Sequence, residues 1–171
     1  LRDRYKRTRN LADLEAAISH SQQIVQATPL DSHSRPARMN SLGAGLLDRY
    51  GHTKNVADLN AAITTFQQAA QATSSDSTDQ SLYLDNLSVG FRNRYLLTKV
   101  LADLQAAISA SQQAVQATPV SSTDRPRRLN NLSLGLRDRS ALTGIGKALD
   151  LEEAISASRQ AVEIGRASCR E

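Results

Sequence analysis

The chain repeats itself every 45 residues. The opening LRDRY returns with few changes in three later places: Leu46–Tyr50, Phe91–Tyr95 and Leu136–Ser140. Residues 1–45 and 91–135 are identical at 27 of 45 positions. A repeat of this length is typical of stacked supersecondary units, each of which buries its apolar face only against its neighbours. The sequence therefore predicts a solenoid, in which function belongs to a surface.

Each repeat carries two helical patterns. Between Leu11 and Ala27, apolar residues recur at three- and four-residue spacings, which indicates an amphipathic helix. Thr28-Pro29 ends it, because proline lacks the backbone N–H that a helix needs. The other helix of the unit is expected to begin after a polar loop, with caps at Ser34, Asp79 and Asp124. The predicted fold is all-α, an α-solenoid of antiparallel helical hairpins, with whole hairpins over 34–73 and 79–118.

Small residues recur along the first helix of each hairpin. They occupy two repeat positions: Gly43, Ser88 and Ser133, then Gly45, Gly90 and Gly135. Glycine inside a helix costs roughly 0.5–1 kcal/mol relative to alanine. Its return in several copies therefore predicts close helix–helix approach.

An arginine and an aspartate also recur in every copy. The arginines are Arg4, Arg49, Arg94 and Arg139, and the aspartates are Asp13, Asp58, Asp103 and Asp150. An active site is normally a single place, whereas a stacking device is repeated. We interpret these residues as structural ion pairs across each hairpin, and we expect no catalysis in the chain.

The last eight residues, Ile164–Glu171, break the repeat and back-translate into a common short-read sequencing adapter. We interpret them as an artefact and residues 1–163 as the repeat array, a fragment with partial repeats at both ends. Cys169, the only cysteine, lies in that tail, so no disulfide or thiolate zinc site is expected. The three histidines, His20, His33 and His52, lack metal-ligand spacing. We expect no cofactor, no metal and no small-molecule substrate.

The charge pattern also excludes partners. The formal net charge is +4, but the cations are interspersed with carboxylates and form no basic block. We therefore expect no nucleic acid as partner. No apolar run reaches the length of a membrane span and no signal segment opens the chain, so we expect no membrane partner either. A cytoplasmic location fits this composition.

The motifs resemble a known repeat family. Ala17, Ser21, Ile24 and Pro29 match the small, aromatic, small, proline pattern of the second helix of a tetratricopeptide repeat, although the period is 45 and only Phe66 is aromatic at its position. The di-alanine, as in Ala16-Ala17, resembles fungal aromatic di-alanine and tetratricopeptide-repeat proteins, which often carry a caspase-like CHAT domain. The resemblance implies a helical superhelix that binds proteins.

By this resemblance, the free face of each first helix lines a concave groove that holds a peptide or a neighbouring domain, including one of the same protein. The candidate groove residues are Asn40, Leu47, Asp85, Arg92, Arg127, Asn130, Leu134 and Arg137. Asn40, Asp85 and Asn130 share one repeat position and are expected to form an exposed polar line. The predicted function is a protein–protein interaction scaffold. The alternatives are a regulatory arm of a CHAT protease or nucleotide-binding signalling protein, and a spacer without ligand.

Overall fold

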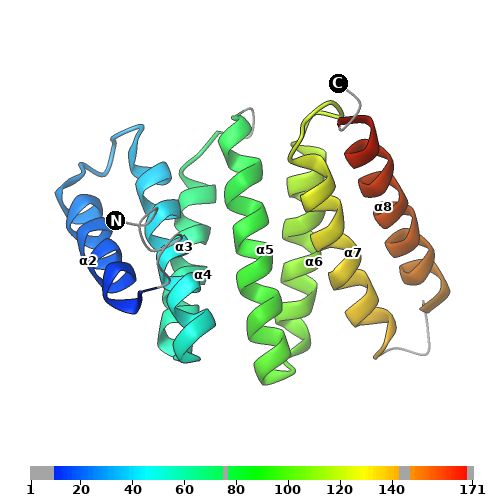
Figure 1. Cartoon of the computed structure of the whole chain (residues 1–171), viewed down its shortest axis with the longest axis horizontal. Helices are drawn as coiled ribbons and strands as arrows, with labels where there is room; N and C mark the ends of the chain where they lie inside the picture. The colour runs from blue at the N-terminus through cyan, green and yellow to red at the C-terminus, as the bar shows by residue number, and fades with distance from the viewer. Residues whose placement is uncertain (1–9, 75–76, 143–146, 169–171) are drawn as a thin grey trace. The chain divides into compact units, whose positions relative to one another are not determined.

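The computed structural model describes residues 10–74, 77–142 and 147–168. The chain divides into two compact units, Leu1–Ser74 and Ser75–Glu171. The first contains α2 (Leu11–Ala27), α3 (Arg35–Thr53) and α4 (Val56–Gln71). Here α3 and α4 form a hairpin, and α2 packs against α3 (Figure 1).

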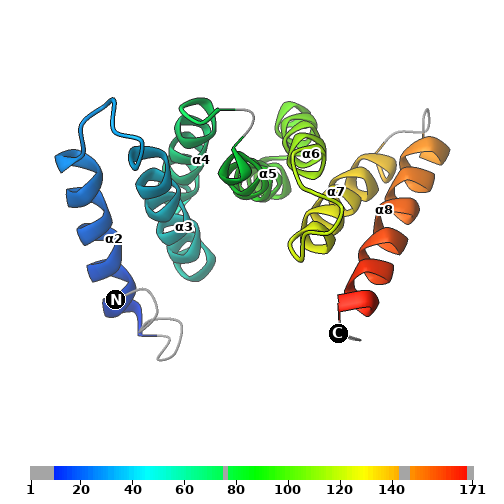
Figure 2. The ribbon, with the colours of Figure 1, turned by 90° about the horizontal axis from the view of Figure 1, so that it is seen from above.

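The second unit contains two helical hairpins. Its helices are α5 (Thr78–Thr98), α6 (Leu101–Gln116), α7 (Arg125–Ser140) and α8 (Lys147–Ser168). The pairs α5/α6 and α7/α8 run antiparallel, and the hairpins stack through contacts of α7 with α6 and, to a lesser extent, with α5 (Figure 2). The predicted all-α architecture of antiparallel hairpins is confirmed. None of the helices in the described residues combines the length and apolar character that crossing a bilayer requires.

The helix boundaries follow the sequence signals, but the caps differ from the prediction. Ser34 and Asp124 do precede α3 and α7, yet neither side chain accepts a capping hydrogen bond. Their backbones are α-helical instead of extended, and a proline at the second helical position removes one N–H that a cap would bind. In α5 the cap is Ser77, whose hydroxyl accepts from the backbone N–H of Asp79.

The repeated glycines lie where helices approach closely, as predicted. A Cβ at Gly43 would lie 2.7 Å from a ring carbon of the fully buried Phe66 on α4. At Gly135 it would lie 2.9 Å from Ile108 Cγ1 on α6, and at Gly45 3.0 Å from Ile18 Cγ1 on α2. Carbon atoms in van der Waals contact stay roughly 3.5–4.0 Å apart. A Cβ at any of these positions would therefore force the neighbouring side chain to shift.

The recurring arginine–aspartate pairs are structural, as predicted, in the three hairpins that the structure describes. In each, the guanidinium at the end of the first helix binds the carboxylate in the first turn of the second helix through two hydrogen bonds. The pairs are Arg49–Asp58, Arg94–Asp103 and Arg139–Asp150, with donor–acceptor distances of 2.5–2.9 Å. Arg4 of the first copy lies outside the described residues.

Two further arginines join consecutive helices in a way that the sequence prediction missed. Arg125 at the start of α7 donates to the backbone carbonyls of Val115 and Thr118, where α6 ends. Arg35 makes the same pair of contacts between α3 and α2. A cation that binds the free carbonyls at a helix C-terminus satisfies acceptors that the helix itself leaves open.

Candidate functional site

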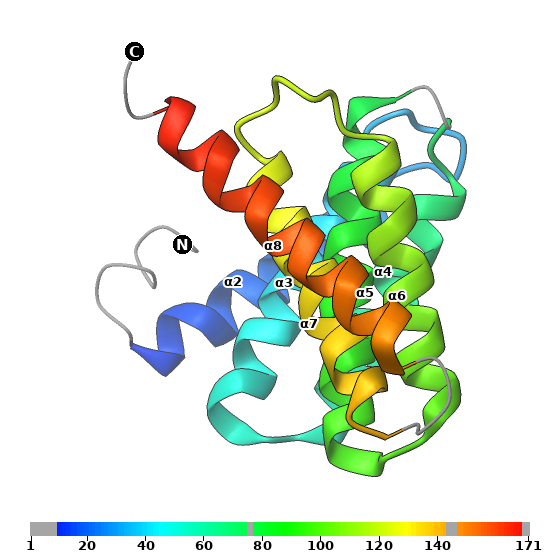
Figure 3. The same cartoon turned by 90° about the vertical axis from the view of Figure 1, so that its right-hand side faces the viewer.

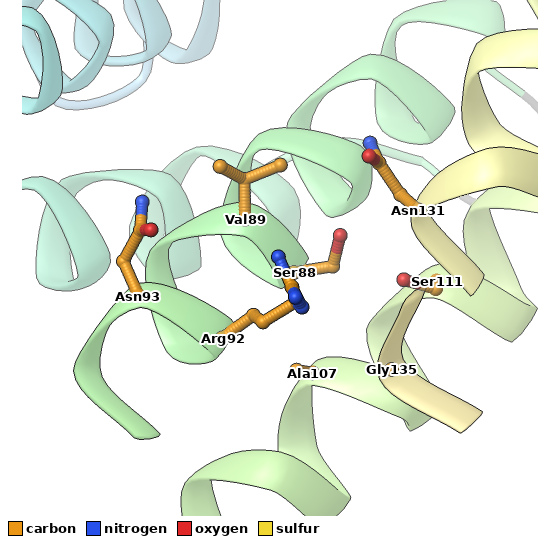
Figure 4. Close-up of a pocket in the computed structure, with 8 residues that line it drawn as sticks. All are labelled: Ser88, Val89, Arg92, Asn93, Ala107, Ser111, Asn131 and Gly135. Atoms are coloured by element: carbon orange, nitrogen blue, oxygen red, sulfur yellow. The ribbon is translucent and has the colours of Figure 1, made fainter. Parts of the chain in front are cut away.

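The second unit contains a small cavity where α5, α6 and α7 meet. It has a volume of about 70 Å³ and is partly open. Its lining comes from three helices: Ser88, Val89, Arg92 and Asn93 on α5, Ala107 and Ser111 on α6, and Asn131 and Gly135 on α7. Figure 4 shows Ser88 and Arg92 directed from α5 toward the side on which Ser111, Asn131 and Gly135 lie.

The cavity arises from a difference between two hairpins at a pair of equivalent positions. In the hairpin α3/α4 the equivalent positions hold Gly43 and Phe66, and the aromatic ring fills the space against the glycine. In the hairpin α5/α6 both positions are serine, Ser88 and Ser111, and both are buried. Two hydroxymethyl groups cannot occupy the volume of a phenyl ring, so space remains between the helices.

In the hairpin α7/α8 the residues at the same two positions bind each other. The equivalent residues are Ser133 on α7 and Ser158 on α8, and their hydroxyl oxygens lie 2.8 Å apart in a hydrogen bond. Ser88 instead donates its hydroxyl to the backbone carbonyl of Asp85 at 2.7 Å. The hydroxyl of Ser88 is therefore used locally within α5.

A polar network closes one side of the cavity. Asp85 on α5 is fully buried, with 0% exposure, and its carboxylate accepts from the guanidinium of Arg127 and from Asn131 Nδ2 at 2.8 Å. Both donors lie on α7. A buried carboxylate is tolerated when cations and hydrogen-bond donors surround it. This network therefore fixes how α7 sits against α5.

An ion pair closes the opposite side of the cavity. Arg92 Nε on α5 donates to Asp138 Oδ2 on α7 at 2.7 Å, and both side chains are mostly buried. Two polar connections thus hold α5 and α7 at either end of the cavity. Ala107 and Ser111 lie between them on α6, so the space is bordered by satisfied polar groups and small side chains.

One sequence-based expectation about this surface is wrong. Asp85 does not form an exposed line with Asn40 and Asn130, because its carboxylate is buried and bound by Arg127 and Asn131. The asparagine that reaches Asp85 is Asn131, the residue that follows Asn130. Adjacent residues on a helix point about 100° apart, so Asn130 is exposed while Asn131 faces the carboxylate.

The remaining predicted residues fall into two groups. Arg92 and Arg127 are part of the polar connections just described. Asn130, Leu134 and Arg137 line one outward stripe of α7, with Asn130 and Arg137 exposed and Leu134 half-buried. Asn40 and Leu47 are half-buried on α3 of the first unit.

Arg137 differs from the other arginines of α7. The guanidiniums of Arg125, Arg127, Arg128 and Arg139 all bind groups of the protein. Among the described residues, the side chain of Arg137 has no such partner. It therefore presents a positive charge to solvent near the end of α7.

Burial distinguishes Arg128 from its neighbours. Its guanidinium donates to the hydroxyl of Thr118 and lies 3.8 Å from the Asp124 carboxylate, while Nε has no partner in the described part of the chain. Desolvation lowers the pKa of Arg128 from its usual value, against the opposing effect of Asp124. We interpret Arg128 as a helix connection at the α6–α7 loop, since its side chain is 5% exposed and reaches no open surface.

The described residues contain no group of three or more His, Cys, Asp or Glu side chains placed to hold a metal ion. No family model matches the chain, and no curated protein is similar to it in sequence. Among solved structures, the chain is similar to one titled "Crystal structure of MamA", with 14% identity, a TM-score of 0.33 and coverage of 96% of both chains. At this identity and score, the likeness carries no conclusion about function.

Proposed function

We propose that the chain is a protein–protein interaction scaffold, whose α5/α7 face binds an extended peptide or a segment of a neighbouring domain. This proposal rests on the cavity between Ser88 and Ser111. In the hairpin α3/α4 the ring of Phe66 fills the equivalent space. The cavity has a volume of about 70 Å³, which corresponds to roughly two water molecules. A small aliphatic side chain of a partner fits such a socket.

The surroundings of the socket indicate the chemistry of the partner. Arg92 and Arg127 are already paired, so they shape the socket and do not supply free charge. Arg137 supplies an exposed cation on the outward stripe of α7, and Asn130 offers amide donors and acceptors on the same stripe. A segment with a small apolar residue beside a carboxylate complements these groups.

The chain itself provides the variant that tests this proposal. Replacing Ser88 by Gly and Ser111 by Phe together copies the Gly43/Phe66 pair into the second unit and fills the socket. Peptides would first be selected from a displayed random 12-residue library and their affinities measured by fluorescence polarisation. The double variant S88G/S111F is expected to lose about tenfold or more in affinity while it stays folded.

Two single variants complete the test. Arg137→Ala is expected to weaken the same peptides, while Arg159→Ala, at an exposed arginine on α8, is expected to leave binding unchanged. Circular dichroism and urea unfolding check that each variant keeps its fold. Peptides that bind S88G/S111F and Arg137→Ala as tightly as the parent chain would refute the proposed surface.

A second role is suggested by the di-alanine motif, Ala61-Ala62 and its equivalents. We infer from it, as the alternative, that the array is the regulatory arm of a larger fungal protein with a CHAT protease or nucleotide-binding signalling domain. The gene sequence downstream of codon 163 tests this alternative. A caspase-like His and Cys pair in an α/β pattern would support it, and an open reading frame without such a domain would contradict it.

A further inference from the structure

One buried hydroxyl in the socket has no hydrogen-bond partner among the residues that the structure describes. It belongs to Ser111 on α6, which lines the cavity and is 3% exposed. In Figure 4 its oxygen points from α6 toward the side on which Ser88 lies. A buried hydroxyl without a partner costs free energy, so such a group is normally paired or hydrated. The socket therefore contains a hydrogen-bonding group that the described part of the chain does not use.

The serines at the same position in other copies of the repeat do have partners. Ser21 on α2 donates its hydroxyl to the backbone carbonyl of Ala17 at 2.8 Å. Ser158 on α8 shares a hydrogen bond of 2.8 Å with Ser133. Ser111 makes neither kind of contact, so its hydroxyl remains for a group that enters the socket.

Two other polar side chains that line the socket are bound within the protein. Ser88 donates its hydroxyl to the backbone carbonyl of Asp85. Asn131 donates through Nδ2 to the carboxylate of the same aspartate. Of the two buried serines in the lining, Ser111 is therefore the one whose hydroxyl no described residue binds.

The rest of the lining and the size of the cavity limit what can pair with Ser111. Ala107 and Gly135 border the same space and present only carbon atoms as side-chain surface. The cavity lies between two consecutive hairpins of the chain and not at an end of the array, and it holds about two water molecules. A matching side chain is small and carries a methyl group beside a hydroxyl. Threonine has both on one carbon, and its shape is nearly that of valine.

We propose that the residue of the partner segment that enters the socket is a threonine. Its hydroxyl forms a hydrogen bond with Ser111, and its methyl group packs against Ala107. This inference rests on the proposed function, because it names the residue that the α5/α7 face selects. Valine fills the same volume, but it displaces water from Ser111 without replacing the hydrogen bond, and such a displacement weakens binding.

The experiment starts from 12-residue peptides selected on the full chain from a displayed random library. Peptides that S88G/S111F binds at least tenfold more weakly are kept. An alanine scan then finds the peptide residue that enters the socket, because its replacement weakens binding to the parent chain and not to S88G/S111F. Fluorescence polarisation compares peptides with threonine, valine or serine at that position. The threonine peptide is expected to bind about tenfold more tightly than the valine peptide and about fourfold more tightly than the serine peptide, which lacks the methyl group.

The variant Ser111→Ala tests the hydrogen bond itself. It removes one oxygen and keeps Cβ, and circular dichroism checks that the fold is unchanged. In this variant the valine peptide is expected to bind at least as tightly as the threonine peptide, because the hydroxyl of threonine then has no partner.

Ser158→Ala is the matched control for Ser111→Ala. It removes a serine at the same repeat position of α8, which lies in front of α7 in Figure 3 and contributes no residue to the cavity. This variant is expected to keep the tenfold preference for threonine.

The results separate this inference from the proposed function. If the parent chain binds the valine peptide as tightly as the threonine peptide, or if Ser111→Ala keeps the preference for threonine, the inference is wrong. The proposed function then still stands, provided that S88G/S111F and Arg137→Ala weaken binding. If no selected peptide is weakened by S88G/S111F, the proposed surface is refuted and the threonine site with it.

Discussion

The packing of Gly43 against Phe66 yields a quantitative prediction. Alanine is a better helix former than glycine by roughly 0.5–1 kcal/mol, so an isolated Gly→Ala change inside a helix should stabilise it. At Gly43, however, the added Cβ would lie 2.7, 2.9 and 3.1 Å from three ring carbons of Phe66. Overpacking of this kind costs about 1–3 kcal/mol. We therefore expect Gly43→Ala to lower the free energy of unfolding by up to about 2.5 kcal/mol.

Gly51 is the matched control for this prediction. It lies in the same helix, α3, and a Cβ there would meet no atom within 4 Å. Gly51→Ala is therefore expected to raise the free energy of unfolding by about 0.5–1 kcal/mol. Urea unfolding followed by far-ultraviolet circular dichroism measures both variants under the same conditions.

A double-mutant cycle identifies the ring as the cause. Phe66→Ala removes all three ring carbons and costs about 3–5 kcal/mol by itself, because the side chain is fully buried. In that background Gly43→Ala no longer meets the ring and should become stabilising, with a coupling energy of about 1–3 kcal/mol. If Gly43→Ala stabilises the unaltered chain as much as Gly51→Ala does, the inferred close contact is wrong.

Charges and backbone conformation give three more testable effects. Hydrogen bonds from Arg139 lower the pKa of Asp150. This carboxylate therefore stabilises the fold above its unfolded pKa of about 3.9, and the contribution is lost as pH falls through the lower folded value. The free energy of unfolding between about pH 5 and 3 should depend less on pH in Asp150→Asn, and equal dependence would contradict the pairing. Arg49→Ala leaves the buried Asp58 carboxylate without its bidentate donor, and thermal unfolding should show a loss of about 1–3 kcal/mol, with Arg49→Lys in between. Lys99 has a positive φ of 60° at the end of α5. Lys99→Gly and Lys99→Ala both lose the contact of Nζ with the Tyr95 ring at 5.5 Å, but only alanine keeps the Cβ that this backbone conformation disfavours, so the glycine variant should be about 1 kcal/mol more stable than the alanine variant.

The sequence predicted those parts of the fold whose local signals recur in several copies of the repeat. Thr28-Pro29 ends α2 as expected, because a proline acts through its own backbone and needs no partner. The Arg94–Asp103 pair was also predictable, since its two members recur at a fixed spacing around a short turn. Such local signals do not depend on how neighbouring hairpins pack.

The parts that the sequence did not predict depend on where two helices meet. Asn130 and Asn131 are neighbours in sequence, and only the position of α7 against α5 decides which of them reaches Asp85. The cavity did have a sequence signal, because Phe66 is replaced by Ser111 while Gly43 is replaced only by Ser88. A pairwise comparison of the copies at these two positions would have indicated the missing volume.

Mapping a bound peptide on the protein shows whether the α5/α7 face is the binding surface. Backbone amide shifts of the isotope-labelled chain would be recorded with and without a selected 12-residue peptide. We expect the largest changes in amide shift at Ser88, Ser111 and Gly135, and we expect them to disappear in S88G/S111F. Changes confined to other faces of the molecule, with these three amides unaffected, would contradict the claim that the α5/α7 face is the binding surface.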